Sequence, residues 1–105
     1  MKLKYGIKLA GLSSQMALGA FVVSDVFERL RAECTITSAN DSTHSAHSLH
    51  YEGRAMDFRT HDFTGDKAAL LAAVKEALGE NFDCVFEAAG TQNEHLHVEY
   101  DPKGE

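Results

Sequence analysis

The sequence predicts a small α+β domain in which an antiparallel sheet carries two main helices on one face. Three observations support this fold class. Apolar residues recur at helical spacing in two segments, four other segments are short and either β-branched or alternating, and the order along the chain is helix, strands, helix, hairpin. The chain has 105 residues, so residues 1–105 are expected to form one domain with its own buried core.

The first helix is expected over residues 14–33. Ser13 or Ser14 is a suitable N-cap, and apolar residues then recur on one stripe as far as Leu30. The mixed residues 1–12 before it predict a short strand or an arm. This helix therefore has one apolar face to bury.

The β-branched residues 34–38 predict the first strand after this helix, and the small polar residues 39–49 predict a loop. Residues 55–60 alternate and predict a second strand. A second helix is expected over residues 66–79, where Asp66 serves as the N-cap, leucine and valine side chains form the inner stripe and Gly79 ends the helix.

A hairpin completes the predicted sheet. Its strands are residues 82–88 and 95–100, and residues 89–93 form the turn between them. The second strand alternates strictly, so its apolar side chains are expected to face the core and its histidines to face a cleft or water.

The charge balance excludes some classes of partner. A formal net charge of −6 argues against a nucleic-acid-binding face and against docking on an anionic membrane. No apolar run reaches the roughly 20 residues of a membrane span. Because Ser13, Ser14 and Gln15 interrupt the apolar N-terminal stretch, no export signal is expected, and the protein is expected to be made in the cytoplasm. A monomer is also expected.

The two cysteines lie in apolar, strand-like segments. Cys34 and Cys84 have no spacing that matches a zinc motif, and buried reduced thiols are therefore expected. A disulfide between neighbouring strands is the alternative.

The histidines indicate a metal site. His95 and His97 lie two positions apart on a strand, so they project from the same face. His50 is followed seven residues later by Asp57, and a tight bend at the glycine between them could bring the two side chains together. His50, Asp57 and His97 would give zinc three nitrogen and oxygen ligands and leave a fourth position for water.

A zinc ion that activates water needs a general base. Glu94 stands three residues before His97, at the start of the strand, and Glu87 ends the preceding strand and would approach across the hairpin. Glu94 is the preferred candidate, but spacing alone leaves both open. His47 and His61 are expected to be solvated loop histidines.

Two motifs resemble known families. The segment HSAHSLHYEGRAMDF resembles the SxHxxGxAxD motif of zinc D-Ala-D-Ala carboxypeptidases and phage endolysin peptidases. It resembles Hedgehog signalling domains even more closely, because those carry nearly the same SLHYEGRA string. The segment EHLHVEY resembles the ExxH and HxH segment of this group, and the similarity runs from Thr35 to Tyr100.

The resemblance implies one Zn²⁺ ion held by His50, Asp57 and His97. It assigns Glu94 to the base position of the peptidases. Hedgehog domains instead place a glutamate before the HxH strand, which favours Glu87.

Other motif positions imply further roles at the site. His95 matches a histidine beside the metal that would help to stabilise the oxyanion. His44, Ser48 and Arg54 match positions that line the cleft or shape its loop, and they are expected to meet the substrate. Arg54 could instead pair with a nearby carboxylate.

The sequence also departs from the two family patterns. The stretch after residues 34–38 lacks the arginine with which many of these peptidases hold a substrate carboxylate, which argues against a strict carboxypeptidase. Of the acidic cluster that binds calcium in Hedgehog domains, Asp41 is the clearest remnant, which argues against the signalling role that depends on that surface.

The resemblance therefore implies a domain of Hedgehog/DD-peptidase type that acts as a zinc metallopeptidase. Its substrate would be a peptide bond in bacterial peptidoglycan stem peptides, cleaved by a DD- or LD-type carboxypeptidase or endopeptidase, and an endolysin would reach the cell wall after release. The alternatives are a catalytically inactive zinc-containing binding module of the Hedgehog type and a zinc enzyme for a different amide.

Overall fold

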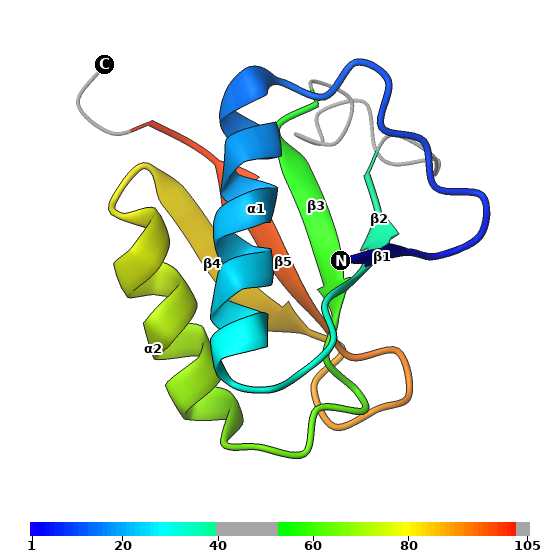
Figure 1. Ribbon diagram of the computed structural model, residues 1–105, viewed down its shortest axis with the longest axis vertical. Coiled ribbons are helices and arrows are strands. Elements are labelled where there is room, and N and C mark those ends of the chain that lie inside the picture. Colours follow the sequence, from blue (N-terminus) through cyan, green and yellow to red (C-terminus); the bar gives the residue numbers. More distant parts are fainter. Residues whose placement is uncertain (40–52, 103–105) are drawn as a thin grey trace.

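The computed structural model describes residues 1–39 and 53–102. This part of the chain contains two α-helices and five strands, and their order agrees with the order that the sequence predicts (Figure 1). The elements are β1 (Lys2–Leu3), α1 (Ser14–Arg29), β2 (Thr35–Ser38), β3 (Ala55–Arg59), α2 (Lys67–Leu78), β4 (Phe82–Glu87) and β5 (His95–Tyr100).

The strands form one sheet in the order β1-β2-β3-β5-β4. The last four of these strands pair antiparallel, and β1 adds a parallel edge through the pairs Lys2–Thr35 and Leu3–Ile36. The predicted α+β class is confirmed, but the sheet is mixed rather than purely antiparallel. A two-residue strand carries too little periodicity to reveal its direction or its partner.

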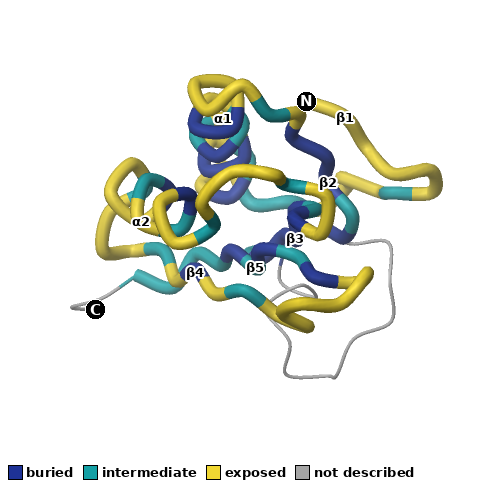
Figure 2. Tube along the Cα trace, turned by 90° about the horizontal axis from the view of Figure 1, so that it is seen from below, coloured by how far each residue is buried: buried dark blue, intermediate teal, exposed yellow. Residues whose placement is uncertain are grey.

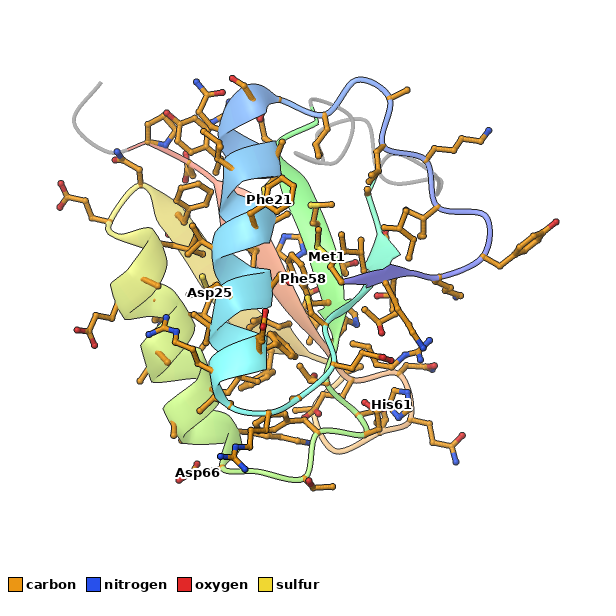
Figure 3. The ribbon with its side chains drawn as sticks, in the orientation of Figure 1. Met1, Phe21, Asp25, Phe58, His61 and Asp66 are labelled. Carbon is orange, nitrogen blue, oxygen red and sulfur yellow. The ribbon has the colours of Figure 1, made fainter. Side chains whose placement is uncertain are left out.

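Both helices lie on the same side of the sheet, α1 against β3 and β5 and α2 against β4 (Figure 2). The core lies between these layers. In Figure 3, Phe58 lies beside α1, between that helix and β3, whereas Phe21 lies on α1 with 65% of its area exposed. The largest fully buried side chains include Phe27, Phe58, Met16, Ile36, Met56, Leu70 and Leu96.

The first helix ends at Arg29, four residues before the expected end. Arg31 has a φ of 59°, which is left-handed and cannot continue a helix. The backbone N–H of Arg31 donates to Glu28 and that of Ala32 donates to Phe27, and this pair of bonds is the Schellman motif. At the other end, the hydroxyl of Ser13 accepts from the N–H of Met16 and confirms the predicted cap.

The second helix has the predicted cap at each end. The carboxylate of Asp66 accepts from the N–H groups of Ala68 and Ala69. Gly79, with a φ of 85°, ends the helix and allows the turn into β4.

A close backbone contact at Gly53 fixes the start of β3. Gly53 has a φ of 70°, and a Cβ atom there would lie 2.1 Å from the carbonyl oxygen of Gly11. The carbonyl of Gly53 also accepts from the N–H of Ser13 at 2.8 Å. Only glycine fits both the angle and the contact, which agrees with the tight bend expected before Asp57.

The two cysteines are free and buried, as expected. Burial raises the pKa of Cys34 and of Cys84 to about 11. Within the described ranges, neither helix is long and apolar enough to cross a membrane.

Candidate metal centre

The candidate site lies on the face of the sheet opposite the helices, here called the open face. Successive side chains of a strand alternate between faces. On β5, Leu96 and Val98 are fully buried in the core, so His95, His97 and Glu99 project from the open face.

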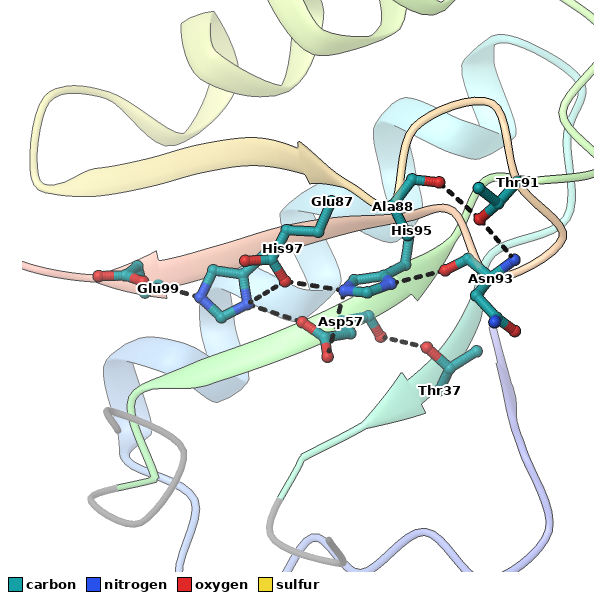
Figure 4. A network of polar contacts seen from close by, with 9 residues as sticks. All are labelled: Thr37, Asp57, Glu87, Ala88, Thr91, Asn93, His95, His97 and Glu99. Atoms are coloured by element: carbon teal, nitrogen blue, oxygen red, sulfur yellow. Dashed lines mark hydrogen bonds and ion pairs between the residues drawn. The ribbon is translucent and has the colours of Figure 1, made fainter. Parts of the chain in front are cut away.

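Asp57 and His97 form the centre of this face. They are direct partners in the β3–β5 register, and His97 Nδ1 lies 2.7 Å from Asp57 Oδ1 (Figure 4). His97 Nε2 lies 2.7 Å from Glu99 Oε1. The hydrogen bond to Asp57 raises the pKa of His97 to about 9, and the bond to Glu99 adds to this against the opposing effect of burial.

His95 and Glu87 lie directly beside this pair. His95 Nε2 is 2.8 Å from Glu87 Oε1 and 3.7 Å from Asp57 Oδ2, and its Nδ1 donates to the carbonyl of Asn93 at 2.9 Å. Burial would lower the pKa of His95, but the bonds to Asn93 and Glu87 outweigh it and the pKa is raised.

The structure brings four of the predicted site residues together: Asp57, His97, His95 and Glu87. They come from three neighbouring strands, so the predicted convergence depends on long-range sheet pairing as well as on local motifs. His44, Ser48 and the predicted ligand His50 lie outside the described residues, as does His47.

The donor set fits zinc. Imidazole nitrogen and carboxylate oxygen are both ligands that zinc accepts. Two ligand atoms on a tetrahedral zinc ion stand about 3.4 Å apart, so a small rotation of Asp57 or His97 would widen the present 2.7 Å separation enough. The described residues offer a second, overlapping set in Asp57, Glu87 and His95, whose ligand atoms all lie within 4.8 Å of one another.

Glu94, the preferred base, does not join the open-face cluster. Its side chain is 4% exposed and forms an ion pair with Lys67 at the start of α2, and it also borders the cleft that Asp57 and His95 line. Burial would raise the pKa of Glu94, but hydrogen bonds from Lys67, the backbone of Gly90 and Thr60, together with the charge of Lys67, outweigh it and the pKa is lowered. Of the two carboxylates considered for the base, Glu87 is the one that lies beside the predicted ligands.

Arg54 is occupied with the end of β5. Its Nε donates to the carbonyl of Tyr100 at 3.0 Å, its guanidinium lies 5.7 Å from the centre of the Tyr100 ring, and it is 3.9 Å from Asp101. These contacts give Arg54 a structural role at the end of β5.

Sequence reasoning missed two residues that complete these networks. Glu99 follows His97 by two positions, and the same alternation that paired His95 with His97 places it on the open face. Lys67 gives no comparable signal, because its contact with Glu94 joins the start of α2 to the residue before β5, 27 positions away.

Comparison with known proteins shows the family. The model of the Hedgehog amino-terminal signalling domain matches residues 10–99, and the chain therefore belongs to this family. It is similar to the Indian hedgehog B protein of Danio rerio, with 37% identity over 79 residues. The match covers 74% of this chain and 18% of that protein, so the chain spans only a small part of the relative's length. No solved structure matches significantly.

These findings correct part of the functional expectation. The family and the Indian hedgehog relative are signalling proteins by name, so the predictions of a peptidoglycan-cleaving zinc peptidase, an endolysin or carboxypeptidase role and a peptidoglycan partner are wrong. The misleading signal was the metal motif, which resembles both groups. The Hedgehog half of the resemblance is confirmed.

Proposed function

We propose that this domain is a zinc-containing signalling module of the Hedgehog type, which acts by binding another protein through the open face of its sheet. The observation that carries the proposal is the direct pairing of Asp57 with His97 on the face of the sheet opposite α1 and α2. The family match supplies the signalling class.

Asp57 and His97 would hold the zinc ion, and the sequence motif assigns His50 as the third ligand. Zinc would neutralise the buried carboxylate of Asp57 and bind His97 in its neutral form. Since His97 is held as a cation by Asp57 and Glu99, zinc binding would release its proton and replace one of its hydrogen bonds. His95 and Glu87 would then support the site by bonding to each other beside Asp57.

Zinc content tests the metal part of the proposal. The purified protein should bind one zinc ion per chain by mass spectrometry under native conditions. The variants His50→Ala and His97→Ala should each weaken binding by more than about a hundredfold, which exceeds the usual effect of residues that only support a ligand. A wild-type protein that binds no zinc after saturation and desalting would refute this part.

A cell-based assay tests the signalling part. The zinc-loaded domain is added to cultured cells that carry a transcriptional reporter of Hedgehog signalling, alone and together with a vertebrate Hedgehog signalling domain. We expect the domain to activate the reporter or to compete with the vertebrate ligand, and Asp57→Ala to do neither. A folded, zinc-loaded protein without either effect would contradict the signalling proposal.

A further inference from the structure

A cleft of about 400 Å³ opens at the edge of the metal centre. Its lining includes Asp57 and His95 and three basic residues, Lys4, Arg59 and His61, here called the Lys4–Arg59–His61 wall. In Figure 3, His61 lies below the end of β3 and away from both helices. The cleft thus adjoins the open face and lies outside the core.

The basic side chains of this cleft lack partners in the described part of the chain. Neither Lys4 nor Arg59 has a side-chain hydrogen bond or ion pair there. Arg59 also borders a smaller cleft lined by Asp62, but the two form no ion pair. Arg59 is half-buried, and within the described residues its guanidinium has no hydrogen-bond acceptor.

The acidic residues around the cleft are already engaged. Asp57 is held by His97, and Glu94 is bound by Lys67. Among the described residues that line the cleft, the charges left to face a ligand are therefore those of Lys4 and Arg59. They form a local positive site on a chain whose formal net charge is −6.

The position of Arg59 links this wall to the metal centre. Arg59 is the register partner of His95 on β5 and lies two residues after Asp57 on the same face of β3. A group held by Arg59 would therefore lie beside the metal centre.

We infer that the Lys4–Arg59–His61 wall makes this domain selective for an acidic segment of its protein partner, with aspartate or glutamate side chains seated in the cleft. This inference rests on the proposed function, since it names the chemistry of the partner at that site. A guanidinium binds a carboxylate through two parallel hydrogen bonds, and Lys4 adds a second positive charge.

Size and charge favour a short acidic segment over a long polyanion. The cleft has the volume of a small-molecule site, which suits one or two side chains. A sulfated polysaccharide or a nucleic acid would extend beyond it on a chain whose formal net charge is −6, and like charges repel over a screening length of about 8 Å in physiological salt.

The test uses nuclear magnetic resonance titrations of the full chain with three synthetic peptides. One alternates glycine with glutamate, the second has glutamine in place of glutamate, and the third has lysine. We expect saturable shifts at the amides of Lys4, Arg59 and His61 with the glutamate peptide only. The variant Arg59→Gln should weaken this binding about tenfold, and high salt should weaken it as well.

Controls separate charge from folding. Lys75→Gln changes an exposed lysine on α2, on the helix side of the molecule, and should leave peptide binding unchanged. Arg59→Lys keeps the charge and should recover part of the binding. The inference would be overturned if the glutamine peptide bound as tightly as the glutamate peptide, or if Arg59→Gln and Lys75→Gln lost the same peptide affinity. It would also be overturned if a heparin hexasaccharide displaced the glutamate peptide at a concentration below that of the peptide.

A metal-free arm distinguishes this inference from the proposed function. Suppose that the protein holds no zinc even after zinc saturation, yet binds the glutamate peptide and loses this binding in Arg59→Gln. The inference about the acidic segment is then correct, and the zinc proposal fails. If the protein binds zinc but shows no glutamate-dependent shifts, the wall is wrong and the zinc proposal stands.

Discussion

The two faces of the sheet are formed by the same three strands but differ in character, since one is apolar and packed against the helices and the other is polar. On β3, Phe58 is fully buried beneath the helices, and its neighbour Asp57 faces the other way beside His97. On β5, Leu96 is buried in the core, and His95 lies on the open face. Neighbouring residues of one strand thus belong to different layers, one a packed apolar core and the other a polar face of histidine and carboxylate side chains.

This difference shows how the fold positions the site. The apolar side chains fix the strand register by packing against α1 and α2, and a slip of one residue would send every side chain to the wrong face. The polar side chains contribute less packing, but they are held at fixed positions by that register. The open face is therefore preorganised by the covered face.

The largest loss of stability is expected from the covered face of the sheet. Phe58→Ala should lower the free energy of unfolding of the metal-free protein by about 4 kcal/mol, because it leaves a cavity in the core. His97→Ala on the open face should cost about 1–2 kcal/mol, the value of a charge-assisted hydrogen bond. Urea unfolding of both variants checks this difference, and equal losses would contradict the assignment of the two faces.

A smaller effect is expected at the ion pair that crosses from sheet to helix. Lys67→Ala leaves the buried carboxylate of Glu94 without its cation and should cost about 2–3 kcal/mol. The loss is below that of a fully buried pair because 35% of the Lys67 side chain is exposed. Urea unfolding measures it, with Lys75→Ala as the matched control.

A second substitution checks the cause of this loss. Adding Glu94→Gln to Lys67→Ala removes the unpaired charge and should recover part of the stability. If the double variant is as unstable as the single one, the loss does not come from the charge of Glu94.

The open face should make stability depend on pH. His97 has a folded pKa of about 9, above the 6.5 of a free histidine. Its contribution is fully present below pH 6.5 and is lost as the pH rises through about 9, with a total on the order of 2 kcal/mol. Nuclear magnetic resonance of the metal-free protein should show this titration, and Asp57→Asn should move the pKa of His97 downward.

The smallest effect concerns the covered face. Cys34 and Cys84 are buried, and burial raises their pKa to about 11, so little thiolate forms at neutral pH. A thiol reagent at pH 8 should label both slowly in the native protein and quickly in urea. Rapid labelling of the native protein would show that this part of the core opens.

Sequence patterns predicted much of this arrangement, because the main signals are local. Helix periodicity and the caps Ser13, Asp66 and Gly79 predicted both helices. The alternation of the HxH segment predicted that His95 and His97 share one face of the sheet. The early end of α1 escaped notice because its stop is a left-handed arginine rather than a glycine.

The choice between the two glutamates shows where local reasoning failed. Glu94 stands an odd number of residues from His97, so the strand period alone would send it to the opposite face. Its spacing matched a peptidase motif, and that match was given more weight than the period. Glu87 depends on the hairpin register with His95, which only the folded sheet fixes.

We propose that the open face holds zinc through Asp57, whereas Glu94 stabilises the fold through its ion pair with Lys67. The most direct measurement is the zinc dissociation constant of Asp57→Asn and of Glu94→Gln, obtained by competition with a chromophoric chelator, with circular dichroism to confirm folding. We predict a loss of more than about a hundredfold for Asp57→Asn and less than about threefold for Glu94→Gln. Similar constants for the two variants, or a larger loss for Glu94→Gln, would contradict the account.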